Sequence, residues 1–357
     1  MSTVYLQHFG LHRAPFSITP NPAFFYGGHS RADMLDAMLY TVTHGEGIIK
    51  VTGEVGSGKT MLCRMLAGRL PPHIDAIYLV NPRLDPDGVL FAIAAELGLD
   101  AGGRRADEVL RLLNADLIRR HARGRQVVLL VEEAQAMPLD TLEAVRLLTN
   151  LETSSHKLLQ IVLFGQPELD EHLALPRMRQ LSERITHSFF VPPLPRELVP
   201  AFLLCRLRAA GYTGGPLFSA GAVRHIARAS GGIVRRINII ADKAMMAAYA
   251  DEAVAVTARH VRLAVAECSF AAPNSRRPAW LAGGVAVAGA AALLLWLVWP
   301  LRAHADATPV SLPVSLPERP ARVAAIGDDA QTQLMFGAIC KMIIAFTANQ
   351  YPSAHNE

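Results

Sequence analysis

The sequence has little charge and lacks the cysteine patterns that build disulfide frameworks or metal sites. Charged side chains make up only 18% of the 357 residues, whereas apolar ones make up 51%. This is lean in charge for a purely soluble protein. The four cysteines are scattered without a CxxC pair, which excludes a disulfide framework and fits a reducing compartment. The 13 histidines do not accompany a CxxC motif, so we expect no structural metal site.

An apolar signal is also missing from the N-terminus, and the one long uncharged run begins late in the chain. Residues 279–299 contain no charged residue, and as a helix they would span about 30 Å, the thickness of a bilayer core. Trp280 lies near one end and Trp299 at the other, as in an interfacial belt. A buried core helix is the alternative, but core helices rarely run this long without a polar face. We therefore predict a transmembrane helix over 279–299 and no signal peptide.

Short apolar strands alternate with helical patterns through the first half of the chain. Such alternation is typical of a parallel sheet that helices cover on both faces. The strands are expected at 47–53, 76–80, 127–131, 158–165 and 187–193. The helices between them are expected at 59–70, 86–99, 106–122 and 139–152. Residues 1–45 are rich in turn formers instead.

The strand pattern stops near residue 196, and a helical pattern replaces it. Helices are expected at 196–210, 219–229, 233–250 and 257–267. We therefore divide the chain into a sheet domain (1–195), a helical lid (196–270), a transmembrane helix (279–299) and a tail (300–357). The tail begins as a proline-rich linker and has no expected fold.

A phosphate-binding motif follows the first predicted strand. The stretch GEVGSGKT matches GxxxxGK[ST] and lies between a strand and a helix. Its glycines allow backbone N–H groups to surround the β- and γ-phosphates at a helix N-terminus. Lys59 would neutralise those phosphates, and the Thr60 hydroxyl would bind Mg²⁺. The residues expected to contact the nucleotide are Gly53, Glu54, Val55, Gly56, Ser57, Gly58, Lys59, Thr60 and Met61.

Two adjacent acids end the predicted strand 127–131. In P-loop proteins a second strand lies beside the loop and ends in an acid that orients the magnesium, and a neighbouring acid can activate the attacking water. Glu132 is therefore predicted to be the magnesium-side acid and Glu133 the catalytic base. The alternative is a pair of solvated glutamates at a strand end.

Six stretches that follow one another over roughly residues 1–268 are characteristic of one family. They read YLQHFGLHRAPFSITPNPAFFY, VTGEVGSGKT, EEAQ, RLLTNLET, LLQIVLFGQPEL and SGGIVRRIN. With the apolar span they resemble the AAA+ ATPases of the general secretion pathway protein A type. These are bacterial inner-membrane proteins of type II secretion, with relatives in type IV pilus and exopolysaccharide systems. The resemblance implies an α/β P-loop NTPase fold with a parallel sheet and a C-terminal helical lid, followed by one transmembrane helix. It also implies ATP and Mg²⁺ as cofactors.

The resemblance implies roles for three further residues. Gln166 follows the fourth strand, where the family has a polar sensor that orients the lytic water; the alternative is a strand-end cap. Arg184 falls where an arginine reaches the γ-phosphate of a neighbouring subunit, so a homo-oligomer is expected; a surface salt bridge is the alternative. Arg235, rather than Arg236, matches the lid arginine that contacts the nucleotide.

The sequence departs from the family pattern at three points. The family usually has Asp where Glu132 stands, which predicts slow hydrolysis, and proline where Val234 precedes the lid arginine. Secretion-type members carry a periplasmic peptidoglycan-binding domain after the span, whereas the 58 residues that follow Trp299 show no such domain.

The favoured function is a membrane-anchored ATPase that acts on a secretion, pilus or polysaccharide export apparatus. It would be a single-pass protein of the bacterial inner membrane with a cytoplasmic ATPase domain and a membrane-protein partner. The rival is a nucleic-acid-handling ATPase of the transposition or replication type, for which RRHARGR (119–125) is the best candidate contact. The predicted membrane span argues against nucleic acid. A nucleotide-dependent regulator with low turnover is a third alternative, which Glu132 keeps open.

Overall fold

The structure is a computed structural model that describes residues 4–28, 30–44, 47–79, 81–153 and 157–268. The chain divides into two units at Ser275, and every described residue belongs to the first. Among these residues, no helix combines the length and the apolar character that crossing a membrane requires. The predicted transmembrane helix (279–299) and tail (300–357) lie outside the described residues.

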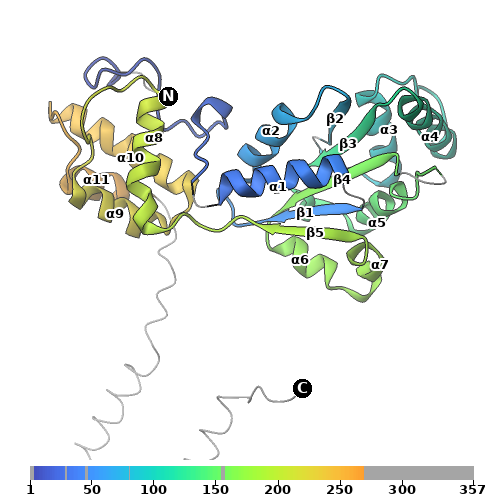
Figure 1. Ribbon diagram of the computed structural model, residues 1–357. Helices are drawn as coiled ribbons and strands as arrows, with labels where there is room; N and C mark the ends of the chain where they lie inside the picture. Colours follow the sequence, from blue (N-terminus) through green and yellow to red (C-terminus); the bar gives the residue numbers. More distant parts are fainter. Residues whose placement is uncertain (1–3, 29, 45–46, 80, 154–156, 269–357) are drawn as a thin grey trace, which may run out of the picture. The chain divides into compact units, whose positions relative to one another are not determined.

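A parallel sheet forms the centre of the N-terminal part (Figure 1). Its strands are β1 (Ile48–Thr52), β2 (Ile74–Leu79), β3 (Gln126–Val131), β4 (Leu159–Gly165) and β5 (Ile185–Phe190). Their order is β2-β3-β4-β1-β5, and each neighbouring pair is parallel. All seven residues of β4 are buried, as continuous apolar runs predict for strands that are covered on both faces.

Helices cover both faces of this sheet. They are α1 (Arg31–His44), α2 (Lys59–Arg69), α3 (Pro86–Glu96), α4 (Ala106–Ala122), α5 (Leu139–Leu148), α6 (Glu168–Leu173) and α7 (Arg179–Ser182). Residues of α1 and α2 share a core with Ile49 and Val51 of β1. Residues of α3, α4 and α5 share a second core with Ile48 on the opposite side of the same strand. Helix α1 was not expected, because residues 1–45 were interpreted as turn-rich.

The strand order brings several loops to one edge of the sheet. β1 pairs with β4, and β4 pairs with β3, all in parallel. Thr52 lies opposite Gly165, and Val131 lies opposite Leu163. The chain therefore leaves β1, β3 and β4 at the same edge, where the loop from Gly53, the acid pair and the residue after Gly165 follow directly.

Four helices follow the sheet domain, as the sequence predicts. They are α8 (Val199–Ala209), α9 (Ala220–Ser230), α10 (Val234–Ala250) and α11 (Ala258–Ala266). Ser219 caps α9 by accepting the N–H of Ala222 over 3.2 Å. Gly231 ends the same helix with φ of 60°, a left-handed conformation that glycine adopts without a steric penalty.

The N-terminal segment packs with these four helices. Its Tyr5, Phe9 and Phe16 are buried in one core with residues of α8, α10 and α11. Arg206 of α8 is also buried there, and its guanidinium donates to the carbonyls of Pro15 (2.7 Å) and Ser17 (3.0 Å). The packing therefore joins the first residues of the chain to the four C-terminal helices, although the predicted boundary counted them with the sheet domain.

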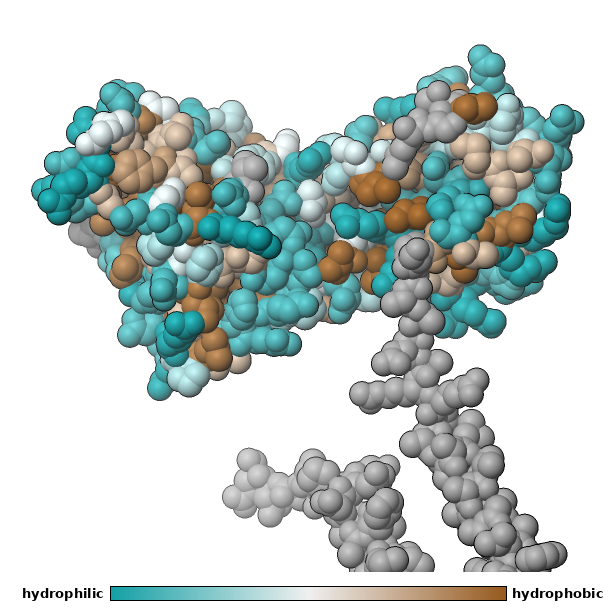
Figure 2. Space-filling view, turned by 180° about the vertical axis from the view of Figure 1, so that it is seen from behind, coloured by the Kyte–Doolittle hydropathy of each residue, from teal (hydrophilic) through white to brown (hydrophobic). Residues whose placement is uncertain are grey.

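The molecular surface carries both hydrophobic and hydrophilic side chains. Figure 2 shows one face on which hydrophobic side chains form separate patches among hydrophilic ones. In the described part of the chain, the large apolar side chains fill three cores, two on the sheet and one among α8, α9, α10 and α11. Burial of this apolar surface is the main contribution to the stability of the fold.

Candidate nucleotide-binding site

The predicted phosphate loop connects β1 to α2. Gly56 and Gly58 have φ of 80° and 111°, which side chains larger than glycine rarely adopt. Gly58 is the N-cap of α2, so the loop ends on the positive end of a helix. The Lys59 ammonium donates to the carbonyls of Gly53 (2.6 Å) and Glu54 (3.0 Å). The loop therefore curves around its own lysine, as a phosphate cradle requires.

Lys59 lies among acidic side chains and near a second cation, Arg235. Its side chain is buried, and burial lowers its pKa, which the charges of Glu133, Glu54 and Glu168 partly counteract. A bound polyphosphate would find a cation that is already desolvated and aimed along the loop.

Glu132 lies beside α2, near the start of that helix. Burial, and then the Glu132 carboxylate, raise the pKa of the Cys63 thiol, so the carboxylate and the thiol are neighbours. Cys63 lies three residues after Thr60 on α2, and residues three apart share a helix face. Thr60 therefore shares a face of α2 with the thiol that Glu132 adjoins. The carboxylate oxygens of Glu132 and the hydroxyl oxygen of Thr60 are ligands that suit Mg²⁺.

Glu133 forms a hydrogen-bonded cluster with two glutamines. Its Oε2 accepts from Gln135 Nε2 (2.7 Å) and from Gln166 Nε2 (2.9 Å). Partial desolvation raises the pKa of Glu133, but these hydrogen bonds and the charges of Lys59 and Arg235 outweigh it, so the pKa lies below its usual value. The carboxylate is therefore ionised at neutral pH, as a proton acceptor must be.

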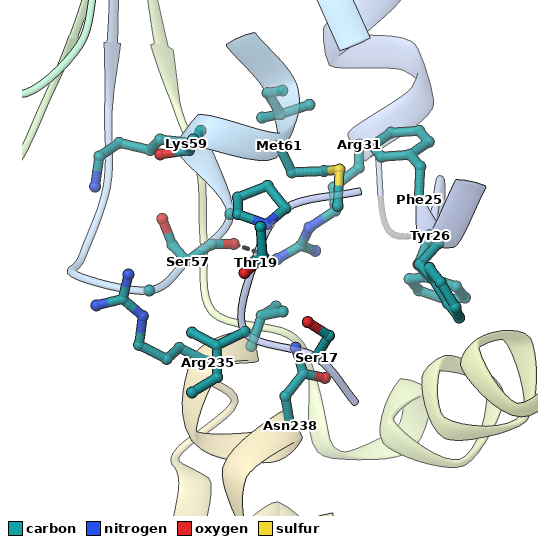
Figure 3. Close-up of a pocket in the computed structure, with 18 of the residues that line it drawn as sticks. Ser17, Thr19, Phe25, Tyr26, Arg31, Ser57, Lys59, Met61, Arg235 and Asn238 are labelled. Atoms are coloured by element: carbon teal, nitrogen blue, oxygen red, sulfur yellow. Dashed lines mark hydrogen bonds between the residues drawn. The ribbon is translucent and has the colours of Figure 1, made fainter. Parts of the chain in front are cut away.

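A pocket adjoins the phosphate loop, and part of its lining was not foreseen from the sequence (Figure 3). Ser17, Thr19 and Tyr26 of the N-terminal segment line it, together with Asn238 of α10. The residues of the loop from Val55 to Leu62 line it as well, and so does Glu133. Ser17, Thr19 and Tyr26 lie in the turn-rich, aromatic stretch FSITPNPAFFY, for which the sequence predicts no role in the site.

Arg31 joins the phosphate loop to the segment after β5, and Arg235 joins the loop to α10. Arg31 Nη2 donates to Pro192 O (3.1 Å), after β5, and lies 3.5 Å from Ser57 O in the loop. The Arg235 N–H donates to Gly56 O over 3.0 Å. Arg235 also lines the pocket, and Figure 3 shows its side chain beside the loop.

Arg184 lies away from this pocket. Its carbonyl accepts the N–H of Ile48, the first residue of β1, over 2.9 Å. Its side chain donates to the Thr149 hydroxyl. The amino end of β1 is the edge opposite the phosphate loop, so the fold does not bring Arg184 to the nucleotide site of its own chain.

A phosphate loop after β1, acids after β3 and a polar residue after β4 define the P-loop class of nucleotide-binding α/β proteins. Comparison with known proteins agrees. The family model of the AAA domain matches residues 42–173. General secretion pathway protein A of Aeromonas hydrophila is 41% identical over 305 residues. That match covers 83% of this chain and 53% of the relative, so the chain spans about half of that protein's length.

Solved structures with a similar fold include two origin recognition proteins. The ORC2 protein of Aeropyrum pernix, in ADPNP and ADP complexes, is 15% identical with a TM-score of 0.53, over 70% of this chain and 72% of that chain. Drosophila ORC bound to DNA is 21% identical with a TM-score of 0.53, over 78% of this chain and 71% of that chain. These similarities show the fold. The chain is an AAA+ P-loop protein, and within that class it is a relative of general secretion pathway protein A.

Proposed function

We propose that this protein binds and hydrolyses ATP at the pocket beside the phosphate loop. The observation that carries the proposal is the convergence of three loops at one sheet edge. Lys59 follows β1, Glu133 follows β3 and Gln166 follows β4, and Glu133 accepts a hydrogen bond from Gln166 while its charge acts on Lys59. A phosphate-binding cation, a carboxylate base and a polar orienting group are the parts that hydrolysis of a γ-phosphate needs.

Each residue has a defined task in this reaction. The loop N–H groups and Lys59 hold the β- and γ-phosphates. Thr60 and Glu132 would hold Mg²⁺, which supplies charge neutralisation between the phosphates when bound. Glu133 accepts the proton of the attacking water, and Gln166 orients that water. Residues 17–20 and 24–26 and Asn238 line the rest of the pocket and would enclose the remainder of the nucleotide.

The lid and a second subunit complete the proposed site. Arg235 enters from α10 and lines the pocket, so lid position and nucleotide occupancy would be coupled. Arg184 faces away from its own pocket and would serve the neighbouring chain of a homo-oligomer. In AAA+-type catalysis such an arginine stabilises the charge that develops on the transferred phosphoryl group.

The cellular setting follows from the relative and from the apolar run. General secretion pathway protein A is named for secretion, and we propose that this chain acts on the assembly of a secretion, pilus or polysaccharide export apparatus through a membrane-protein partner. Residues 279–299 would cross the bacterial inner membrane once. The ATPase domain would lie in the cytoplasm, and the arginines at 276 and 277 agree with the positive-inside rule.

The rival function in nucleic-acid handling has less support. In the segment 119–125, Arg119 and Arg120 bond to Asp116 over 2.8 Å and 2.6 Å. Arg120 and Arg125 also pair with Asp75. These arginines already neutralise carboxylates of their own chain, so the segment offers less positive charge to a phosphate backbone than its sequence indicates.

Two substitutions test the proposed hydrolysis in the full chain. Lys59→Ala should abolish or greatly weaken ATP binding, because the phosphates lose their main cation. Glu133→Gln should stop turnover and leave ATP bound, because an amide cannot accept the proton. Nucleotide titration and phosphate release measure the two effects. Undiminished affinity of the first variant, or undiminished turnover of the second, would contradict the assignment.

Reporter fusions test the membrane topology separately. Fusions at residues 270 and 310 should report opposite sides of the membrane, with the first in the cytoplasm. Two fusions that report the same side would refute a spanning helix at 279–299.

A further inference from the structure

The Glu133 carboxylate is held by two carboxamides, and one of them, Gln135, has no role in the site described so far. Gln135 Nε2 and Gln166 Nε2 both donate to Glu133 Oε2, over 2.7 Å and 2.9 Å. Gln135 Oε1 also accepts the backbone N–H of Gln166 over 2.9 Å. The three hydrogen bonds close a ring that joins the end of β3 to the end of β4.

The two glutamines hold this ring in different ways. Gln135 uses both ends of its carboxamide, one on the carboxylate and one on a backbone N–H whose position β4 fixes. The Gln166 side chain, within the described part of the chain, is held through Nε2 alone. The Gln166 side chain can therefore turn towards a bound phosphate while its backbone stays in place. Gln135 cannot move without breaking two bonds.

Glu133 needs such support because its backbone conformation is unfavourable and its exposed side chain is otherwise free to rotate. Its φ and ψ of 54° and 40° are left-handed, a conformation that costs about 1–2 kcal/mol for residues other than glycine. Its side chain is exposed and has several rotatable bonds, so a solvated carboxylate would visit many rotamers. Misplacing a reacting group by about 1 Å can cost on the order of a hundredfold in rate.

We propose that Gln135 is a positioning residue for ATP hydrolysis. It fixes the Glu133 carboxylate while the Gln166 side chain exchanges between Glu133 and the nucleotide. The proposal rests on the proposed function, since it requires Glu133 to activate the attacking water. Gln135 acts only through Glu133, so its loss changes the rate of hydrolysis and leaves nucleotide affinity as it was.

The test compares ATP hydrolysis and ATP affinity of the full chain in detergent with those of Gln135 variants. Gln135→Ala should lower kcat by about 10- to 100-fold and leave Kd within about twofold. Gln135→Glu keeps the size and the acceptor for the Gln166 N–H, but it replaces the donor by a second negative charge, so its loss should be at least as large. Gln135→Asn keeps both groups on a shorter chain and should recover part of the rate. Gln180→Ala, at an exposed position of α7, is the matched control and should leave kcat unchanged.

A double variant separates positioning from a structural role. Glu133→Gln stops turnover and leaves ATP bound, so the double variant is judged by Kd and by the thermal midpoint. Adding Gln135→Ala should change neither, because a residue that acts only through Glu133 has no separate effect on binding or stability. If Gln135→Ala keeps the parental kcat while Glu133→Gln stops turnover, the role of Gln135 is overturned and the proposed function stands. If Gln135→Ala lowers kcat, weakens ATP affinity and lowers the thermal midpoint together, its role is structural and the proposal is equally overturned. If Glu133→Gln retains turnover, or the parent shows none, the proposed function fails and the role of Gln135 with it.

Discussion

Replacing Glu132 by Asp tests how this chain places its magnesium-side acid. Glu132 directly follows Val131, whose side chain is fully buried at the end of β3. The backbone at the strand end is therefore fixed, and the length of the side chain decides where the carboxylate lies. In the structure that carboxylate is a neighbour of the buried Cys63 thiol, one helical turn beyond Thr60.

The size of the effect follows from the geometry. Asp is shorter than Glu by one carbon–carbon bond, about 1.5 Å, so its carboxylate would withdraw from Cys63 towards the strand end. A displacement of about 1 Å in phosphoryl transfer can cost on the order of a hundredfold. The Glu side chain can absorb part of its extra length by folding back, so we expect Glu132→Asp to raise kcat by about tenfold, or about 1.4 kcal/mol. ATP affinity should change little, because the phosphate loop carries it.

The assay is steady-state phosphate release by the full chain, with ATP affinity measured in parallel. Glu96→Asp makes the same chemical change at an exposed position at the end of α3, and it should leave both quantities unchanged. If Glu132→Asp is no faster than the parent, the longer side chain is already accommodated. The explanation of the Glu at this position would then be wrong.

Three further substitutions test the oligomer, the ion pairs and the N-terminal segment. Arg184→Ala should slow hydrolysis without weakening ATP binding, and mixing it with Lys59→Ala protein should restore part of the rate, since each chain would supply what its neighbour lacks; a mixture with no recovery would contradict a role between subunits. Hydrogen bonds from its arginine partners hold the pKa of Asp75 below its usual value. The ionised Asp75 carboxylate therefore contributes its full stabilisation of the fold above the pKa that Asp75 has in the unfolded chain. That contribution is lost as the pH falls through the lower pKa of the folded protein. Asp75→Asn should therefore lower the free energy of unfolding at pH 7, and urea titrations should show the difference shrinking below about pH 4; a difference independent of pH would refute this. Arg206→Met should lower the free energy of unfolding by about 2 kcal/mol, because two buried carbonyls lose their donor, and should weaken ATP binding, because the segment it holds lines the pocket; unchanged ATP affinity would show that the segment does not contribute to binding.

Local sequence determined the parts of the site that are contiguous in the chain. The stretch from Gly53 to Thr60 specifies its own geometry, since glycines at positive φ and a following helix are enough to form a phosphate cradle. The strands β1 to β4 were equally predictable, because apolar runs of strand length alternate with helices. β5 is mostly exposed and begins at Ile185, two residues before the expected range. The pattern alone also predicted the helices α8, α9, α10 and α11 and the Ser219 cap.

Helix α1 has a helical pattern in its sequence that the turn-forming residues before it obscured. Leu35, Met38 and Val42 are buried on one face, and their spacing of three and four residues is helical. The prolines and glycines that precede them led to a turn-rich prediction for the whole stretch 1–45. A window that begins after Gly28 would have shown the period.

Tertiary structure alone decided which distant residues meet. Gln135 and Gln166 contact one carboxylate because β3 and β4 are neighbours in the sheet, and strand order is a property of the whole fold rather than of any window. The N-terminal segment lines the pocket because Arg206 of α8 and the lid core hold it there. The pairing of β5 with β1 and the bond to Thr149 set the position of Arg184 at the far edge of the sheet. Each of these arrangements depends on packing between segments far apart in the chain, and such packing has no period or spacing that a sequence can display.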